Sequence, residues 1–181
     1  MSGGGGGNFP QGSYGWWRAN YATDTEYQRV CSVLKSYGWD VSRTEIDHFP
    51  PDSTYSGPFS HVEYAMKPAF PLIVPLHQPS SGHSYSGGYA TSSKSSNLAK
   101  EYRSILSSDM QAGDFFAAMR QDLIDKMNLA LHATTSNKGG MASQRGLFNA
   151  LLRPAVMLAW QQGWITQRQC EELLGLLYSF Q

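Results

Sequence analysis

The sequence EIDHFPP at residues 45–51 places a carboxylic acid beside an imidazole, and this pair has the chemistry of a hydrolytic site. Asp47 and His48 end a run that contains the β-branched Thr44 and Ile46, and two prolines follow. Proline lacks the N–H that a strand uses and fixes its own φ, so a strand is predicted to end here. Neighbouring side chains at a strand end diverge, which would let one bind a metal ion while the other accepts a proton from water.

Two later histidines are candidates for the same site. His77 ends the apolar run FPLIVPLH, and His83 lies in the Gly/Ser-rich run SSGHSYSGG. Carboxylate and imidazole bind divalent cations, so one residue of the Asp47–His48 pair could hold a metal ion while the other faces the attacking water, and His77 and His83 could complete the coordination. Each also has a structural interpretation: Asp47 as the acceptor of a turn, His77 as an imidazole at the edge of the core, and His83 as an ordinary loop residue.

The elements around these residues divide the chain into two halves. At 181 residues it has the length of one domain. Residues 1–15 are Gly-rich and are predicted to be a flexible leader, and residues 16–181 a single globular domain. Within it, 16–97 would form the half with the metal site and 98–181 a helical half. We expect an α+β fold, with a small β-rich, loop-rich front half packed on a bundle of about four helices.

Capping residues and apolar spacing predict where several elements begin. Thr23 with Glu26, and Thr166 with Gln169, have the spacing of capping boxes, and Asp114 precedes a long apolar-periodic helix. The run at 70–77 is predicted to be a strand, followed by a long polar surface loop. Such long loops are usually functional or disordered.

The charge balance gives no overall attraction to nucleic acid or to an anionic membrane, because 14 basic residues equal 14 acidic ones. Lys94, Lys100 and Arg103 are the candidates for a local phosphate-binding patch; a solvated helix face is the other interpretation. No run approaches the roughly 20 apolar residues of a transmembrane helix, and the N-terminal residues lack a signal-peptide pattern. We expect cytoplasmic synthesis, no membrane partner, and any export to need no cleavable signal.

The order of these segments resembles the HNH/endonuclease VII-like nuclease domains of bacterial polymorphic toxins. The resemblance rests on DHFPP, on the proline-flanked MKPAFPLIVPLH and on the polar loop, over roughly residues 40–97. It implies a ββα-metal nuclease in which His48 is the general base, with Asp47 and His77 or His83 as ligands of one Mg²⁺ or Zn²⁺. It also implies a nucleic acid substrate, DNA or RNA, and, for the toxic domain of a secreted effector, an immunity protein as partner. Asn97 is the candidate for a ligand on the following helix.

Two other functions fit parts of the sequence. Cys31 could act as a nucleophile with His48 or His77 as base, as in a cysteine peptidase or amidase; its place within an apolar helical face argues against this, because reactive thiolates favour helix N-termini. Alternatively, the segments YSGGY and GSYGWW have the Tyr/Ser/Gly chemistry of adaptable recognition loops. They indicate a non-catalytic binding module with an aromatic, Gly/Ser-rich surface.

Overall fold

The computed structural model describes residues 8–77, 97–135 and 146–179. Within these ranges it contains seven α-helices, three short 3₁₀ turns and one two-stranded sheet, which confirms the predicted α+β class. The elements run in the order α1 (Tyr14–Asn20), α2 (Thr25–Ser36), β1 (Thr44–His48), η1 (Asp52–Thr54), η2 (Gly57–Phe59), η3 (Tyr64–Met66), β2 (Ala69–Ile73), α3 (Val74–His77), α4 (Asn97–Gln111), α5 (Phe115–Thr135), α6 (Asn149–Gln161) and α7 (Gln167–Ser179).

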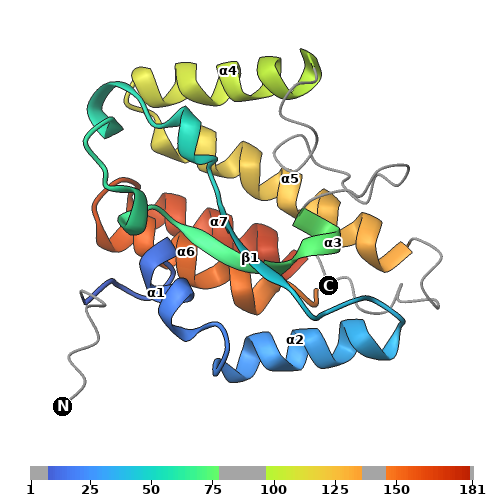
Figure 1. The fold of residues 1–181 in the computed structure, drawn as a ribbon. Helices are drawn as coiled ribbons and strands as arrows, with labels where there is room; N and C mark the ends of the chain where they lie inside the picture. The colour runs from blue at the N-terminus through green and yellow to red at the C-terminus, as the bar shows by residue number, and fades with distance from the viewer. Residues whose placement is uncertain (1–7, 78–96, 136–145, 180–181) are drawn as a thin grey trace.

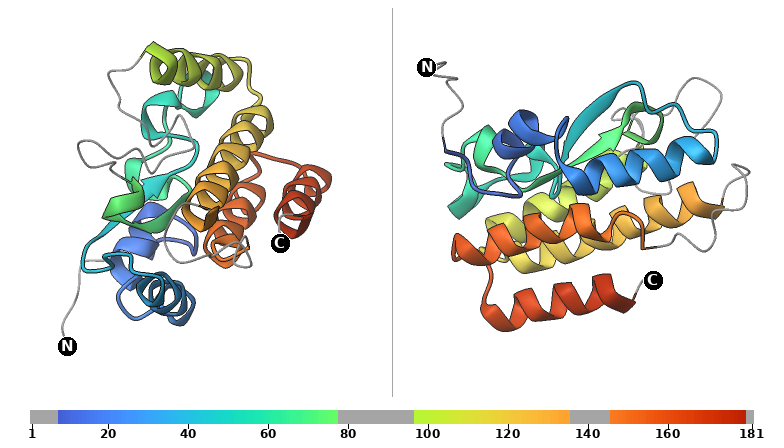
Figure 2. Two further views of the ribbon diagram at one scale, coloured as in Figure 1. Left: turned by 90° about the vertical axis from the view of Figure 1, so that its right-hand side faces the viewer. Right: turned by 90° about the horizontal axis from the view of Figure 1, so that it is seen from below.

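The β-ribbon lies between two groups of helices. Figure 1 shows α1 and α2 on one side of β1 and the longer helices α4 to α7 behind and above it. In the left view of Figure 2, α5 and α6 separate the ribbon from α7. All five residues of β2 are buried, as expected for a strand that contacts α1 as well as α6. The ribbon is therefore an internal element whose side chains meet helices on both faces.

The two strands pair antiparallel over their full length. Thr44 lies opposite Ile73, and His48 lies opposite Ala69. The predicted strand at 70–77 is wrong in its second half, because Val74–His77 forms the short helix α3. Pro75 favours the change, since its fixed φ suits the first turn of a helix.

Helix caps bear out part of the sequence prediction. The Thr166–Gln169 capping box is confirmed by two reciprocal bonds, from Thr166 N–H to Gln169 Oε1 (2.9 Å) and from Gln169 N–H to Thr166 Oγ1 (3.1 Å). The predicted Thr23 cap is wrong: Asp24 caps α2 instead, accepting from the N–H of Tyr27 at 2.8 Å. Asp is at least as good an N-cap residue as Thr, and Asp24 directly precedes Thr25, the first residue of α2.

Part of the predicted flexible leader, residues 8–15, has a defined structure. Helix α1 starts at Tyr14, and the buried Ser13 caps it. The Tyr14 N–H donates to the Lys67 carbonyl at 2.9 Å, and the Ala69 N–H donates to the Gly12 carbonyl at 2.9 Å. The prediction of a flexible leader is therefore wrong for residues 8–15, which bind the start of β2; residues 1–7 lie outside the described ranges.

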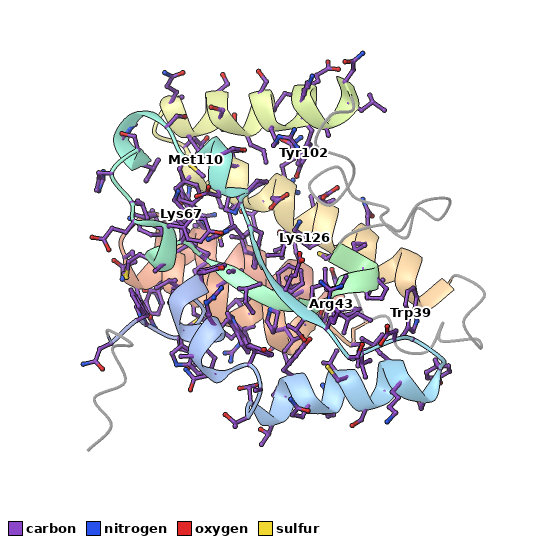
Figure 3. All side chains as sticks on the ribbon, viewed as in Figure 1. Trp39, Arg43, Lys67, Tyr102, Met110 and Lys126 are labelled. Carbon is purple, nitrogen blue, oxygen red and sulfur yellow. The ribbon has the colours of Figure 1, made fainter. Side chains whose placement is uncertain are left out.

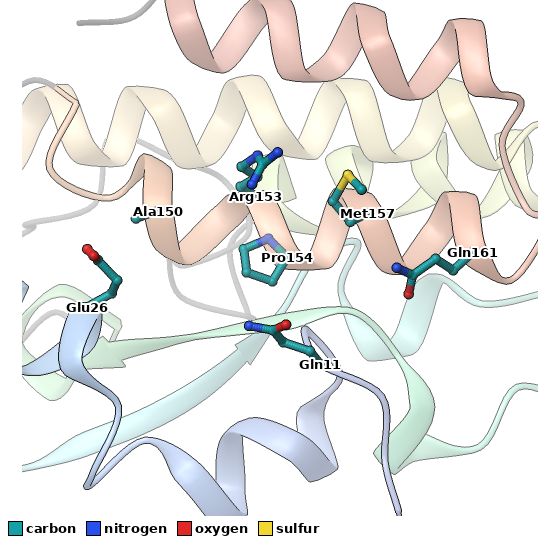
Figure 4. A pocket seen from close by; sticks show the side chains of 7 residues that line it. All are labelled: Gln11, Glu26, Ala150, Arg153, Pro154, Met157 and Gln161. Atoms are coloured by element: carbon teal, nitrogen blue, oxygen red, sulfur yellow. The ribbon is translucent and has the colours of Figure 1, made fainter.

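Gly12 is required by both its backbone angle and its surroundings, which gives a stability prediction. Its φ is +90°, and an added Cβ would collide with the Pro154 carbonyl of α6; Figure 4 shows Pro154 facing the adjacent Gln11. Gly38 has the same φ but open space around it. Gly38→Ala should cost about 1–2 kcal/mol of unfolding free energy, and Gly12→Ala should cost a further ~1–3 kcal/mol from overpacking. Urea unfolding would measure both; equal costs would contradict the packing of this segment on α6.

Candidate functional site

Strand β1 directs Asp47 and His48 to opposite faces of the ribbon. Side chains alternate along a strand, so His48 shares its face with Thr44. Thr44 contacts Tyr27 of α2, and His48 contacts Tyr14 of α1. Asp47 faces the other way, toward Lys126 of α5. The adjacent pair that the sequence singles out is thus divided between two separate environments.

The imidazole of His48 is held between two tyrosines. The Tyr14 ring stacks on it at a centroid distance of 4.7 Å and an interplanar angle of 8°, and the Tyr64 ring meets it edge-on at 4.4 Å. Its Nε2 lies 3.1 Å from the Tyr64 carbonyl. Because a carbonyl only accepts, Nε2 must carry the proton, and the lone pair of the neutral ring lies on Nδ1. The side chain is therefore oriented with Nδ1 as its basic atom.

Burial keeps this imidazole neutral. His48 is only 6% exposed. Burial disfavours the charged imidazole and lowers the pKa of His48 below the ordinary 6.5. The Tyr64 carbonyl and the nearby Asp52 and Asp47 carboxylates favour the charged form but do not outweigh burial. At pH 7 the ring is therefore an unprotonated base.

The lowered pKa of His48 predicts a pH-dependent stability. An unfolded chain binds a proton near pH 6.5 that the folded imidazole resists, so the free energy of unfolding should fall as the pH drops through and below that value. We expect urea midpoints between pH 7 and pH 5 to decrease more steeply for the wild type than for His48→Gln. Parallel decreases in the two proteins would mean that the folded and unfolded pKa values of His48 are the same.

On the opposite face, Asp47 joins a buried group of charged side chains. Its Oδ2 lies 2.9 Å from Lys126 Nζ, and the two side chains are 10% and 0% exposed. Asp122 and Asp125 of α5 are also buried, and the Tyr102 hydroxyl of α4 donates to Asp122 Oδ1 at 2.7 Å. Figure 3 shows Lys126 in the middle of the molecule, with Tyr102 above it. The group ties β1 to α5 and α5 to α4.

This buried group contains three acidic side chains but one basic side chain. The carboxylates of Asp47, Asp122 and Asp125 raise the pKa of Lys126 above its ordinary value despite burial, so the ammonium stays charged. Burial raises the pKa of Asp122 to about 7, although Lys126 opposes that shift. The Lys126 ammonium is thus shared among three acidic side chains. This arrangement is costly to break, because the carboxylates would stay buried after losing their ionic partner.

The described residues do not fit the metal role that the resemblance implies for Asp47. Its carboxylate already meets the Lys126 ammonium, which would repel a divalent cation at that oxygen. His48 Nε2 is likewise engaged, and it lies on the other face of β1. Among the side chains described within residues 8–76, 97–129 and 146–179, no three of His, Cys, Asp or Glu are arranged to hold a metal ion.

The strand register separates His77 from the Asp47–His48 pair. His77 ends α3, which follows the end of β2 that pairs with Thr44. His48 pairs with the opposite end, and a five-residue strand spans about 13 Å between these points. The backbone positions of the predicted ligands Asp47 and His77 therefore lie toward opposite ends of the ribbon. The predicted ligand His83 and the predicted phosphate contact Lys94 lie outside the described residues.

The remaining predicted substrate residues belong to α4, on another side of the molecule. Lys100 is exposed and Arg103 half-buried on this helix, and Asn97 is its exposed first residue. Figures 1 and 2 place α4 and α1 at opposite sides of the ribbon. Lys100 and Arg103 are thus not next to the His48 ring, whose neighbours come from α1 and η3.

The surface beside His48 is hollowed. Tyr14, Arg18 and Tyr21 from α1 and its C-cap, residues 44–46 of β1, and Tyr64 line an open hollow of about 480 Å³. We call this the tyrosine hollow. Because Tyr14 and Tyr64 also contact the His48 ring, they form the layer between the hollow and the imidazole.

A second hollow of about 440 Å³ lies between α6, α2 and the segment before α1 (Figure 4). Glu26 and Arg153 line it, but both are exposed, and Glu26 already pairs with Arg29 at 3.2 Å. It offers no buried polar group comparable to His48.

Sequence reasoning missed the residues that surround the predicted pair. Lys126 had a signal: it follows Phe115 and Met119 at helical spacing, so a lysine lies on the apolar face of a buried helix and needs a buried acid. No sequence pattern indicated Tyr14 or Tyr64, because their contacts with His48 depend on the path of the chain around β2.

The environment of Cys31 is that of an inert thiol. It lies within α2 and is half-buried, and burial raises its pKa. A nucleophilic cysteine needs the opposite shift, toward thiolate at neutral pH.

No helix in the described part of the chain combines the length and apolar character needed to span a membrane.

Comparison of the chain with models of known protein families, with curated proteins and with solved structures gives no match.

Proposed function

We propose that the chain is a nuclease in which His48 is the general base. The observation that carries the proposal is the state of this imidazole: neutral, with Nε2–H bound to the Tyr64 carbonyl and the lone pair on Nδ1. A base of this kind can take the proton from a water molecule as it attacks the phosphorus of a phosphodiester. The sequence resemblance around DHFPP supports the same role for His48.

The environment favours a phosphodiester over a neutral substrate. Arg18 in the tyrosine hollow supplies a guanidinium, whose planar fork matches phosphate oxygens. The Asp47–Lys126 pair supports the other face of β1 and would hold the strand that carries His48. In this proposal Asp47 contributes to structure, and no chemical step passes through a metal ion at its carboxylate.

The experiment that tests the function is cleavage of nucleic acid by the purified chain. Supercoiled plasmid, single-stranded DNA and RNA are incubated with Mg²⁺, with Zn²⁺ and with EDTA. The proposal expects cleavage of at least one substrate that His48→Ala abolishes, and the resemblance further implies that EDTA stops it. No cleavage of any substrate under any of these conditions would overturn the proposal.

A binding module remains the second candidate, and the tyrosine hollow favours it. Three tyrosines and one arginine on an open surface are typical of recognition sites, with or without catalysis. Binding in the hollow without cleavage would distinguish this function from the nuclease.

A further inference from the structure

The chemistry of the tyrosine hollow suits a nucleotide. Its lining includes the aromatic residues Tyr14, Tyr21 and Tyr64 together with Arg18. Its volume of about 480 Å³ lies within the range of small-ligand sites. Aromatic faces bind bases and a cation binds phosphate, which is the combination that single-strand-binding proteins use.

We propose that the tyrosine hollow binds unpaired nucleotides of a single-stranded nucleic acid, with Arg18 on a phosphate and a base stacked on Tyr64. The proposal deepens the nuclease function and rests on it, because it assigns the substrate class to the surface beside His48.

Arg18 and Tyr64 present the required groups to solvent. Arg18 is exposed on α1, and its Nη1 donates to the Tyr14 hydroxyl at 3.3 Å. A guanidinium has five N–H donors, of which this bond uses one. Tyr64 is 51% exposed even though its ring contacts His48 and Tyr14. Burial and a hydrogen bond with Tyr14 raise the pKa of Tyr64 to about 12, so the phenol is uncharged at neutral pH and does not repel a phosphate.

The same lining argues against duplex binding. The base faces of a duplex are covered by their neighbours, so tyrosines can stack only on unpaired bases. Duplex binding depends instead on many phosphate contacts, and Arg18 is the single cation among the residues that line this hollow.

The test is the fluorescence anisotropy of a labelled mixed-sequence octanucleotide, as single-stranded DNA, single-stranded RNA and duplex. It is measured on the full chain carrying His48→Gln, which prevents cleavage, and repeated on the wild type in EDTA. We expect the single strands to bind at least about tenfold more tightly than the duplex. Tyr64→Ala should weaken single-strand binding about 5- to 150-fold, the range for one stacked base.

Arg18→Ala supplies a second readout. It should weaken binding and reduce the slope of log K against log salt by about 0.7, the value for one phosphate contact on a single strand. Arg29→Ala, on the exposed surface of α2, is the matched control and should change neither quantity.

The outcomes separate this inference from the proposed function. The site would be overturned if duplex bound as tightly as single strands or more tightly. It would also be overturned if neither Tyr64→Ala nor Arg18→Ala weakened single-strand binding. In both cases, cleavage of nucleic acid by the wild type would still support the nuclease function. Single-strand binding that depends on both residues, in a chain that cleaves nothing, would support the site and overturn the nuclease. Absence of oligonucleotide binding in both proteins would overturn the site, and a glycan or peptide ligand would then be sought.

Discussion

Lys126→Met should lower the free energy of unfolding by about 3–5 kcal/mol, the usual cost of removing one partner from a buried ion pair. The methionine fills much of the same space, but it leaves the carboxylate of Asp47 buried at β1 and those of Asp122 and Asp125 at α5 without their cation. Urea unfolding at pH 7 measures the change, with unaltered m-values as the check on two-state behaviour.

Two further measurements separate this electrostatic cause from a packing defect. The deficit of Lys126→Met should shrink at pH 5, where the unpaired acids can protonate, whereas a packing defect would persist. Lys100→Met, at an exposed position of α4, is the matched control and should change stability by no more than about 0.5 kcal/mol. If the two variants have equal stability, Lys126 is not the cation that holds β1 against α5.

His48→Gln should reduce the rate of nucleic acid cleavage by about 10²- to 10⁴-fold, the usual contribution of a general base. Glutamine keeps a side-chain donor for the Tyr64 carbonyl but cannot accept a proton at neutral pH. Initial rates on the best substrate, at saturating and at low concentration, would measure the change in kcat and in kcat/KM.

The exposed His61 provides the control for this variant. His61→Gln makes the same chemical change at the surface and should leave the rate within about twofold, since His61 is exposed and is neither of the tyrosines whose rings contact the imidazole of His48. A loss confined to KM in His48→Gln would assign His48 to substrate binding, and an unchanged rate would remove it from the mechanism.

The local elements were predictable because local chemistry determines them. The β-branched Thr44 and Ile46, followed by prolines, predicted β1 and its end, and the Thr166–Gln169 spacing predicted the start of α7. The effect of Pro75 was underestimated, because the apolar residues around it favour a strand while its fixed φ suits the first turn of α3.

The surroundings of the candidate site were not predictable, because they depend on contacts distant in sequence. The partner of Asp47 is Lys126, in a helix from the other half of the chain. Tyr14 reaches His48 because a segment that reads as a glycine-rich leader binds the residues before β2. Alternation along β1 did predict that Asp47 and His48 diverge, but which neighbour each would meet follows only from the packed helices.

The pH dependence of kcat/KM for cleavage tests the role of His48 most directly, because this quantity reports the pKa of the base in the free enzyme. The wild type should lose activity on acidification with an apparent pKa below the ordinary histidine value near 6.5, since burial disfavours the charged imidazole. The residual activity of His48→Gln should lack that transition. A wild-type transition at or above 6.5, or one that persists unchanged in His48→Gln, would contradict His48 as the neutral general base of this protein.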